Sequence, residues 1–321
     1  MLSRVADNLY WMSRYLERAE HTARLLDVNL HGVLDQTTEA AQRRWGRLLS
    51  SVHTDLPSSL SGDAYGITQA MTVDASNPAS IVSCVTAARD NARQAWEQIN
   101  SEMWEQINRL FLHVGRTSMD EIWLGEPHAF FTTVKEGAHL FQGITDGTMG
   151  HGEGWHFIRV GRAIERAAAT ATLIGAHFTT GATLEGEPLV HLEWVGLLKS
   201  CTAFEAYVKF NSASVTPESI AAFLLLNADF PRSVRFMAAD IRSGLHAVGR
   251  ATGGRGGRPE RLAGRLQAAL DYSQIDEIMG DDLHAFLTFI GQQCDQIHTA
   301  IYQTFLRYPV GTALASRGLG F

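Results

Sequence analysis

The sequence predicts an all-α protein, a bundle of long antiparallel helices, and three observations lead to this fold class. Apolar residues recur at three- and four-residue steps over long stretches, which is the period of amphipathic helices packed on a core. Alternating runs of β-branched residues, which would indicate strands, are few. One charged helical segment recurs 148 residues further on, so we expect a single domain over residues 1–321 with related halves of about 1–150 and 151–321.

The repeat is centred on residues 14–19 (RYLERA), which return as residues 162–167 (RAIERA). Positions 22–23 and 25–26 match 170–171 and 173–174, and the apolar positions 9 and 12 match 157 and 160. In each copy Arg, Glu and Arg stand at i, i+3 and i+4, so they share one side of a helix. That side of the first copy also carries Tyr10, Trp11 and Leu25, so we expect both sides of the helix to be covered.

Covered charges need partners, because a buried ion loses its hydration. If the two helices meet, four arginines face two glutamates, which leaves about two positive charges. The residues are Arg14, Arg18, Arg162, Arg166, Glu17 and Glu165. The surplus would suit a carboxylate or phosphate site, since guanidinium groups grip planar anions through paired hydrogen bonds. Alternatively the cluster is a buried clamp between helices, balanced by acids elsewhere, of which the candidates are Glu20, Glu102, Asp120 and Glu121.

In the first half we expect a helix from Val5 to Leu34, a second from Thr38 to Val52, and a loop over residues 56–77 with room for a short helix. Asn77-Pro78 is typical of a helix start, and the apolar spacing predicts one long helix from there to about residue 113. Residues 118–121 (SMDE) fit a capping box, which predicts a helix ending near the glycines between 143 and 154.

The glycine-rich turn leads into the second charged helix, expected from Trp155 to Phe178. Further helices are expected over residues 189–210, 217–226, 230–248, 259–270 and 281–306. Residues 252–258 are rich in Gly and Arg and superficially resemble a phosphate loop. They lack a preceding strand and the Lys-Ser/Thr ending, so we interpret them as a flexible basic linker.

Two further arginines, Arg232 and Arg235, follow Phe230-Pro231 at a predicted helix N-terminus. Backbone N–H groups at such a terminus add affinity for anions, so both are candidates for anion binding. The alternative is that Phe230 and Phe236 pack while the two arginines stay solvated.

Other chemistry finds little support. Glu17 and His21 share a helix face as in ferritin-type ligand pairs, but Ala169 replaces the histidine in the second copy, so we expect neither a metal nor another cofactor. No nucleophile elbow accompanies a serine. The three cysteines, Cys84, Cys201 and Cys294, are widely separated in apolar surroundings and are expected to be reduced core residues.

Composition excludes some partners. The formal charge of −7 argues against a nucleic-acid surface, and no stretch reaches the ~18 apolar residues that cross a membrane. The N-terminal residues lack the apolar run of a signal peptide, so a cytoplasmic protein is expected.

Three stretches, residues 9–20, 154–167 and 230–235, closely resemble the bacterial alpha-E family, which is named for its helical fold and Glu-Arg motif. Residues 101–104 also look like that family's pattern. The resemblance covers nearly the whole chain and identifies residues 17–18 and 165–166 as the Glu-Arg motifs. This chain departs from the pattern at His151 and His156, where many relatives carry Arg, and at residues 210–212, where a more basic run is replaced.

Members of that family are encoded beside, or fused to, circularly permuted ATP-grasp proteins, often with a transglutaminase-like peptidase. The resemblance therefore implies an accessory or substrate-binding component of an ATP-grasp amide-ligase or peptide-modification system, whose cluster holds a carboxylate or phosphate of a peptide or small molecule. Two alternatives stay open. One is an enzyme of acyl or amide transfer or hydrolysis with Glu17 or Glu165 as general base, although adjacent arginines make a carboxylate a poorer base. The other is a purely structural scaffold.

Overall fold

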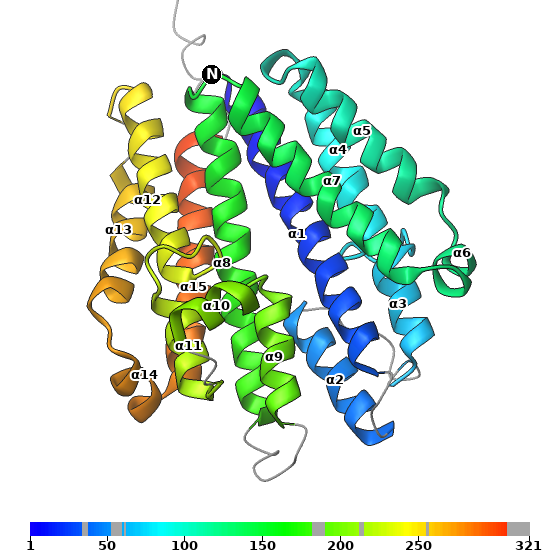
Figure 1. Ribbon diagram of the computed structural model, residues 1–321. Helices are drawn as coiled ribbons and strands as arrows, with labels where there is room; N and C mark the ends of the chain where they lie inside the picture. The colour runs from blue at the N-terminus through cyan, green and yellow to red at the C-terminus, as the bar shows by residue number, and fades with distance from the viewer. Residues whose placement is uncertain are drawn as a thin grey trace, which may run out of the picture.

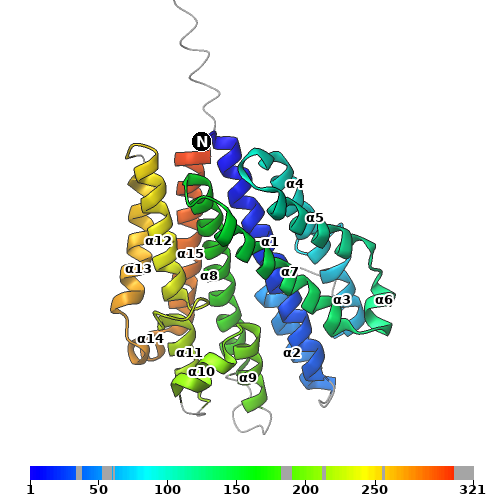
Figure 2. The same cartoon turned by 45° about the horizontal axis from the view of Figure 1, so that its top comes forward.

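The computed structural model describes residues 1–33, 38–52, 60, 62–181, 190–211, 215–254 and 257–306. Every regular element within these residues is a helix, which confirms the all-α fold class. The two longest described helices, α1 (Ser3–Val33) and α8 (Glu153–Gly181), pack against each other in the middle of the bundle (Figures 1 and 2). These are the two charged helices of the repeat.

The first half is built around α1. Helices α4 and α7 pack on α1, and α5 packs on both α4 and α7. These helices lie to the right of α1 in Figure 1 or cross in front of it. The elements after α1 are α2 (Thr38–Ser51), α3 (Ala64–Thr72), α4 (Ile81–Gln94), η2 (Trp96–Gln98), α5 (Ser101–Arg116), α6 (Met119–Leu124) and α7 (Pro127–Thr148).

The second half repeats this packing around α8. Helices α12 and α15 pack on α8, and α13 packs on both α12 and α15, on the left of Figure 1. The two halves also exchange a helix, since α2 packs on α8 and α9 packs on α1. The elements after α8 are α9 (Val190–Ser200), α10 (Phe204–Asn211), α11 (Pro217–Leu226), α12 (Val234–Ala251), α13 (Gly257–Tyr272), α14 (Ile275–Asp281), α15 (Leu283–Ile301) and the π-helical turn η3 (Tyr302–Leu306).

The single long helix expected from Asn77 to residue 113 is wrong, because the chain breaks between α4 and α5. Apolar residues keep their three- and four-residue spacing through the break, so the spacing did not reveal it. The local signal is Asn100, whose side chain accepts a hydrogen bond from the Met103 amide at 2.9 Å and caps α5. Ser80, and not Asn77, caps α4.

Two other expected helices are also divided. The capping box of Ser118 and Glu121 forms as predicted, but it opens only the short α6, and Pro127 begins α7 after a turn at Gly125. The helix expected over residues 189–210 is split into α9 and α10 at Thr202, whose φ of 53° does not continue a right-handed helix. Helix α14 was not predicted, and α13 begins inside the predicted linker 252–258. Of the residues named in the predictions, Leu34, Leu189, Ser212 and residues 56–59, 61 and 255–256 lie outside the described residues.

Both sides of α1 are covered, as expected. The side chains of Tyr10 and Leu25 on its charged side are 0% and 1% exposed. The three cysteines are buried and unpaired, as predicted, and burial raises the pKa of each thiol to about 12. No described helix is long and apolar enough to cross a membrane.

Candidate functional site

Helices α1 and α8 touch at equivalent positions of the repeat. Ser13 and Gly161 correspond to each other, and a Cβ atom placed on Gly161 would lie 2.4 Å from Ser13 Oγ and 2.5 Å from the Tyr10 main-chain oxygen. Glycine permits this approach because it has no side chain. Contact between equivalent residues is the pattern of two related units arranged about a twofold axis. It places the Glu-Arg motifs of the two copies opposite each other.

Each Glu-Arg motif is paired with the motif of the other copy. Arg166 donates hydrogen bonds from Nε to Glu17 Oε1 at 2.6 Å and from Nη2 to Glu17 Oε2 at 2.7 Å. In return Glu165 accepts from the Nε atoms of Arg18 and Arg14, both at 2.7 Å. These reciprocal ion pairs join α1 to α8. The predicted clamp is therefore present.

A second layer of charge lies against Glu17. Arg232 donates from Nη2 to Glu20 Oε2 at 2.8 Å and lies 3.4 Å from Glu17, while Arg24 also pairs with Glu20. Arg232 is only 8% exposed, so the expectation that it stays solvated is wrong. Arg232 directly precedes the Ser233 cap of α12, which packs on α8, and its side chain reaches Glu17 and Glu20 of α1, which supply countercharge.

The Arg/Glu cluster is defined here as Arg14, Glu17, Arg18, Glu20, Arg24, Glu165, Arg166 and Arg232. Within it five arginines share three glutamates, which leaves two positive charges. Of the acids that the sequence offered as further partners, Glu20 joins the cluster, but it does not complete the balance. The other candidates serve elsewhere, since Asp120 accepts from the Tyr65 hydroxyl and Glu121 caps α6.

The glutamates of the cluster stay ionised. Burial by itself would raise the pKa of Glu17, but the charges of Arg166 and Arg232 outweigh burial, and the pKa is lowered. Burial would also raise the pKa of Glu165, but the charges of Arg14 and Arg18 outweigh burial, and the pKa is lowered. A carboxylate whose pKa is lowered is a weaker proton acceptor. This electrostatic setting favours binding over general-base catalysis.

A cleft of about 820 Å³ opens beside the cluster. Its walls come from α1, the end of α2, the turn before α4, α8 and α15. Arg14 and Arg18 line it, and the Arg18 side chain is 33% exposed there. The Nε atom of Arg18 donates a hydrogen bond to Glu165, and neither terminal nitrogen of Arg18 makes a hydrogen bond to any described residue. The cleft thus exposes the anion-binding edge of a guanidinium group.

His21 is a second unsatisfied group on the cleft wall. Its side chain is 8% exposed, and its buried Nε2 has no hydrogen-bond partner within the described residues. Burial is the main cause that lowers the pKa of His21 to about 4, so the imidazole is neutral at pH 7. Sequence reasoning weighed His21 only as a metal ligand.

The cleft exists because small residues replace the second layer of charge on one side of the crossing. The counterparts of Glu20, His21 and Arg24 at the repeat offset are Ala168, Ala169 and Thr172, and all three line the cleft. Ala79 precedes the Ser80 cap of α4 as Arg232 precedes the Ser233 cap of α12, and Ala79 also lines the cleft. The repeat therefore fills one side with Arg232, Glu20 and Arg24 and leaves the other side open.

Two of the predicted anion-binding arginines lie outside this arrangement. Arg162 is half-buried beside Arg166 and makes no ion pair or hydrogen bond with a described residue, and burial followed by the charge of Arg166 lowers its pKa. Arg162 does not line the cleft but borders a cavity of about 10 Å³ with Ser13 and Gln142. Arg235 pairs with Asp271 at 2.8 Å and joins α12 to α13.

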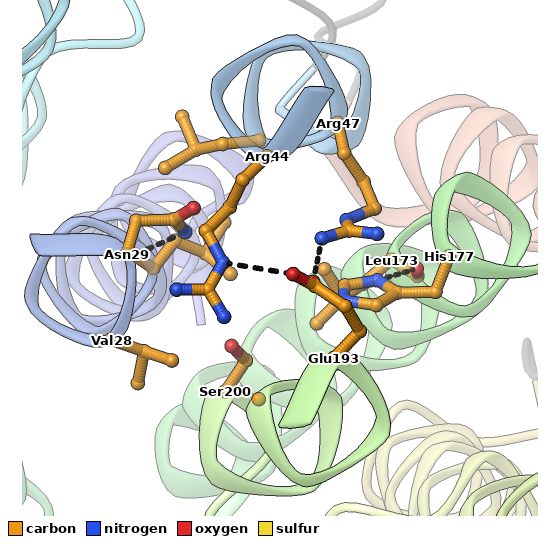
Figure 3. Close-up of a pocket in the computed structure, with 11 residues that line it drawn as sticks. Val28, Asn29, Arg44, Arg47, Leu173, His177, Glu193 and Ser200 are labelled. Carbon is orange, nitrogen blue, oxygen red and sulfur yellow. Dashed lines mark hydrogen bonds and ion pairs between the residues drawn. The ribbon is translucent and has the colours of Figure 1, made fainter. Parts of the chain in front are cut away.

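Sequence reasoning missed a second arginine–glutamate group, which Figure 3 shows between α1, α2, α8 and α9. Arg47 and Arg44 of α2 both pair with Glu193 of α9, the latter at 3.6 Å, and all three are buried. His177 of α8 lies beside them on a cavity of only about 20 Å³. The i,i+3 spacing of the two arginines was the available signal. Because the cavity is small and both arginines pair with Glu193, we interpret this group as a structural ion-pair cluster that joins the exchanged helices α2 and α9.

The family model Alpha-E, described as a predicted alpha-helical domain with a conserved ER motif, matches residues 1–306. The chain belongs to the Alpha-E family. In this member the ER motifs are Glu17-Arg18 and Glu165-Arg166, and each motif binds the other across the α1–α8 contact.

Three similar proteins carry no functional name. A protein of Mycobacterium bovis and two from strains of Mycobacterium tuberculosis, each named only as an uncharacterized protein, are 25% identical over 311 residues. The matched region covers 88% of this Alpha-E chain and 34% of each relative, so the chain spans about a third of their length. No solved structure gives a significant match.

Proposed function

We propose that this Alpha-E protein is an accessory, substrate-binding component of a bacterial ATP-grasp amide-ligase or peptide-modification system in the cytoplasm. In this proposal the cleft holds the carboxylate of a peptide or small molecule against Arg18. The ATP-grasp partner, and a transglutaminase-like peptidase beside it, follow from the family resemblance. The ligand class follows from the cleft.

The observation that carries the proposal is the unsatisfied polar lining of the cleft. The terminal nitrogens of Arg18 lack hydrogen bonds to described residues, and so does the buried Nε2 of His21, a residue that lines the same cleft. Leaving a buried polar atom such as His21 Nε2 unpaired costs on the order of 1–3 kcal/mol, and the exposed terminal nitrogens of Arg18 are available to a ligand in the cleft. A bound carboxylate would accept hydrogen bonds from the terminal nitrogens of Arg18.

The other charges of the cleft narrow the ligand class. Asp74 and Asp295 also line the cleft, so its walls carry acids as well as arginines. A phosphate dianion would be repelled by these acids, whereas a carboxylate with a nearby ammonium group would be attracted at both ends. We therefore favour an amino acid or a peptide end over a phosphate compound.

An enzymatic role for Glu17 or Glu165 has weaker support. Both carboxylates are held by arginines that lower their pKa, and Glu17 is only 1% exposed. A purely structural role explains the reciprocal ion pairs but not the cleft. We therefore assign the ion pairs to stability and the exposed edge of Arg18 to ligand binding.

Calorimetric titration of the purified protein tests the proposal. Trialanine with a free carboxylate is compared with trialanine C-terminal amide, and the free acid is expected to bind at least about tenfold more tightly, because a charge-assisted bidentate pair is lost in the amide. Arg18→Met keeps the apolar stem and removes the guanidinium group, so it should abolish this difference.

Arg235→Met is the matched control, because the Arg235 side chain is also 33% exposed and also uses Nε for one acid. Equal binding of acid and amide, or equal loss in both variants, would contradict carboxylate binding at Arg18. The assignment to a ligase system is tested separately by co-purification with a circularly permuted ATP-grasp protein from the same genome. Failure of that experiment alone leaves the carboxylate site in place and removes the partner.

A further inference from the structure

A group of metal-ligand side chains lies away from the cleft, where the last turns of α1 meet the first turn of α7. Asp27 and His31 stand four residues apart on one face of α1, and His128 is the second residue of α7. The Asp27 side chain is buried at 7% exposure, whereas the two imidazoles are 57% and 61% exposed. The carboxylate is thus held by the fold, and solvent reaches the histidines.

The ligand atoms converge on one point. Nδ1 of His128 lies 2.8 Å, and Nδ1 of His31 3.4 Å, from Oδ1 of Asp27. One such atom from each residue lies within 4.8 Å of the other two. A tetrahedral ion with bonds of about 2.0–2.1 Å holds its ligand atoms roughly 3.3 Å apart, so coordination requires the side chains to rotate until their ligand atoms reach that spacing.

Neighbouring contacts orient the set. Lys135 donates to the other oxygen of Asp27, Oδ2, at 2.5 Å and leaves Oδ1 directed at the imidazoles. A hydrogen bond to the non-ligating oxygen is the usual support of a metal-binding carboxylate. The two imidazole rings meet edge to face with centroids 4.7 Å apart. Nδ1 of His31 also lies 2.8 Å from the main-chain oxygen of Asp27, a contact that coordination would replace.

We infer that Asp27, His31 and His128 form a binding site for a divalent transition-metal ion such as Zn²⁺ between α1 and α7. Two imidazoles and one carboxylate suit Zn²⁺ and its neighbours, whereas Mg²⁺ and Ca²⁺ prefer sets made of oxygen. Three protein ligands leave a coordination position for water or another donor. The ion would tie the C-terminal turns of α1 to α7, which packs along the same helix that carries Glu17 and Arg18.

Titration of the metal-free protein with ZnCl₂, followed by calorimetry, tests the site. The expected result is one Zn²⁺ per chain, weakened at least about tenfold by His31→Ala or His128→Ala, with no comparable binding of Mg²⁺. Both histidines are exposed, so these variants should fold. Co²⁺ in place of Zn²⁺ should give the strong visible absorption of a tetrahedral site in the wild-type protein and lose it in both variants.

The matched control is His246→Ala. His246 is also 57% exposed and lies 2.9 Å from a carboxylate, that of Glu260, but it belongs to no three-ligand group within the described residues. The His246→Ala variant should bind Zn²⁺ as tightly as the wild-type protein does. Unchanged Zn²⁺ binding in His31→Ala and His128→Ala, or absence of a one-to-one site in the wild-type protein, would overturn the inference.

Discussion

Glu17 and Glu165 are equivalent in sequence, yet the structure predicts that neutralising them has unequal effects on stability. The substitutions Glu17→Gln and Glu165→Gln each remove one negative charge and keep the side-chain shape. Glu17 is 1% exposed and lies between Arg166 and Arg232, whose side chains are 12% and 9% exposed. Both glutamates border the cleft, but one partner of Glu165, Arg18, is 33% exposed there.

The magnitude follows from this difference in solvation. Removing one partner of a buried ion pair leaves the other charge without compensation and costs about 3–5 kcal/mol. Glu17→Gln leaves the buried Arg166 in that condition, while Arg232 keeps its pair with Glu20, so we expect a loss of about 4 kcal/mol in the free energy of unfolding. For Glu165→Gln, water in the cleft can solvate Arg18. Arg14 keeps its contacts with the Tyr10 hydroxyl, His298 and the Trp11 ring, so the expected loss is smaller, about 1–2 kcal/mol.

Urea unfolding of the wild-type protein and both variants at pH 7, followed by circular dichroism, measures the two losses. The double variant Glu17→Gln with Arg166→Met should lose less than the sum of its single substitutions, because the unpaired guanidinium group is gone. Equal losses for Glu17→Gln and Glu165→Gln, or a loss below about 1 kcal/mol for Glu17→Gln, would refute the argument that solvation distinguishes the two motifs.

Two further predictions concern the helix contact and the buried histidines. Gly161→Ala should lower the free energy of unfolding by about 1–3 kcal/mol, because the new methyl group meets the main-chain oxygen of Tyr10. Gly143→Ala, whose methyl group would have nothing within 4 Å, should raise the free energy of unfolding by about 0.5–1 kcal/mol. Urea unfolding measures both changes. Burial is the main cause that lowers the pKa of His21 to about 4 and of His177 to about 3. The unfolded chain therefore binds protons below pH ~6.5 that the folded protein does not, and stability should fall from pH 6.5 to 4.5. Glu17, Glu20 and Glu165 have lowered pKa values, so the stability that depends on their charge is lost only below about pH 4.5. His177→Gln should reduce the slope of stability against pH by about 1.4 kcal/mol per pH unit, and an unchanged slope would show that His177 does not carry it.

The sequence by itself determined the fold class, the repeat and which charged residues each copy of the repeat carries. Helical periodicity is a local property of the chain, so the all-α class and the course of α1 and α8 could be read from it. The repeat offset identified both Glu-Arg motifs and the surplus of positive charge. The same periodicity did not reveal the helix breaks at residues 95–100, at Gly125 and at Thr202, because an apolar stripe can keep its spacing through a turn.

Only the tertiary structure decided which charges meet. That Arg166 binds Glu17, and that Arg232 is buried against Glu20, depends on contacts between segments more than a hundred residues apart. The cleft likewise arises from what is missing on one side, since Ala79, Ala168 and Ala169 stand where the other half carries charged or ring side chains. The grouping of Asp27, His31 and His128 also required the packing of α7 on α1. Local sequence determines which residues share one face of a helix. The twofold arrangement of α1 and α8 determines which of these faces form ion pairs between the helices and which line the cleft.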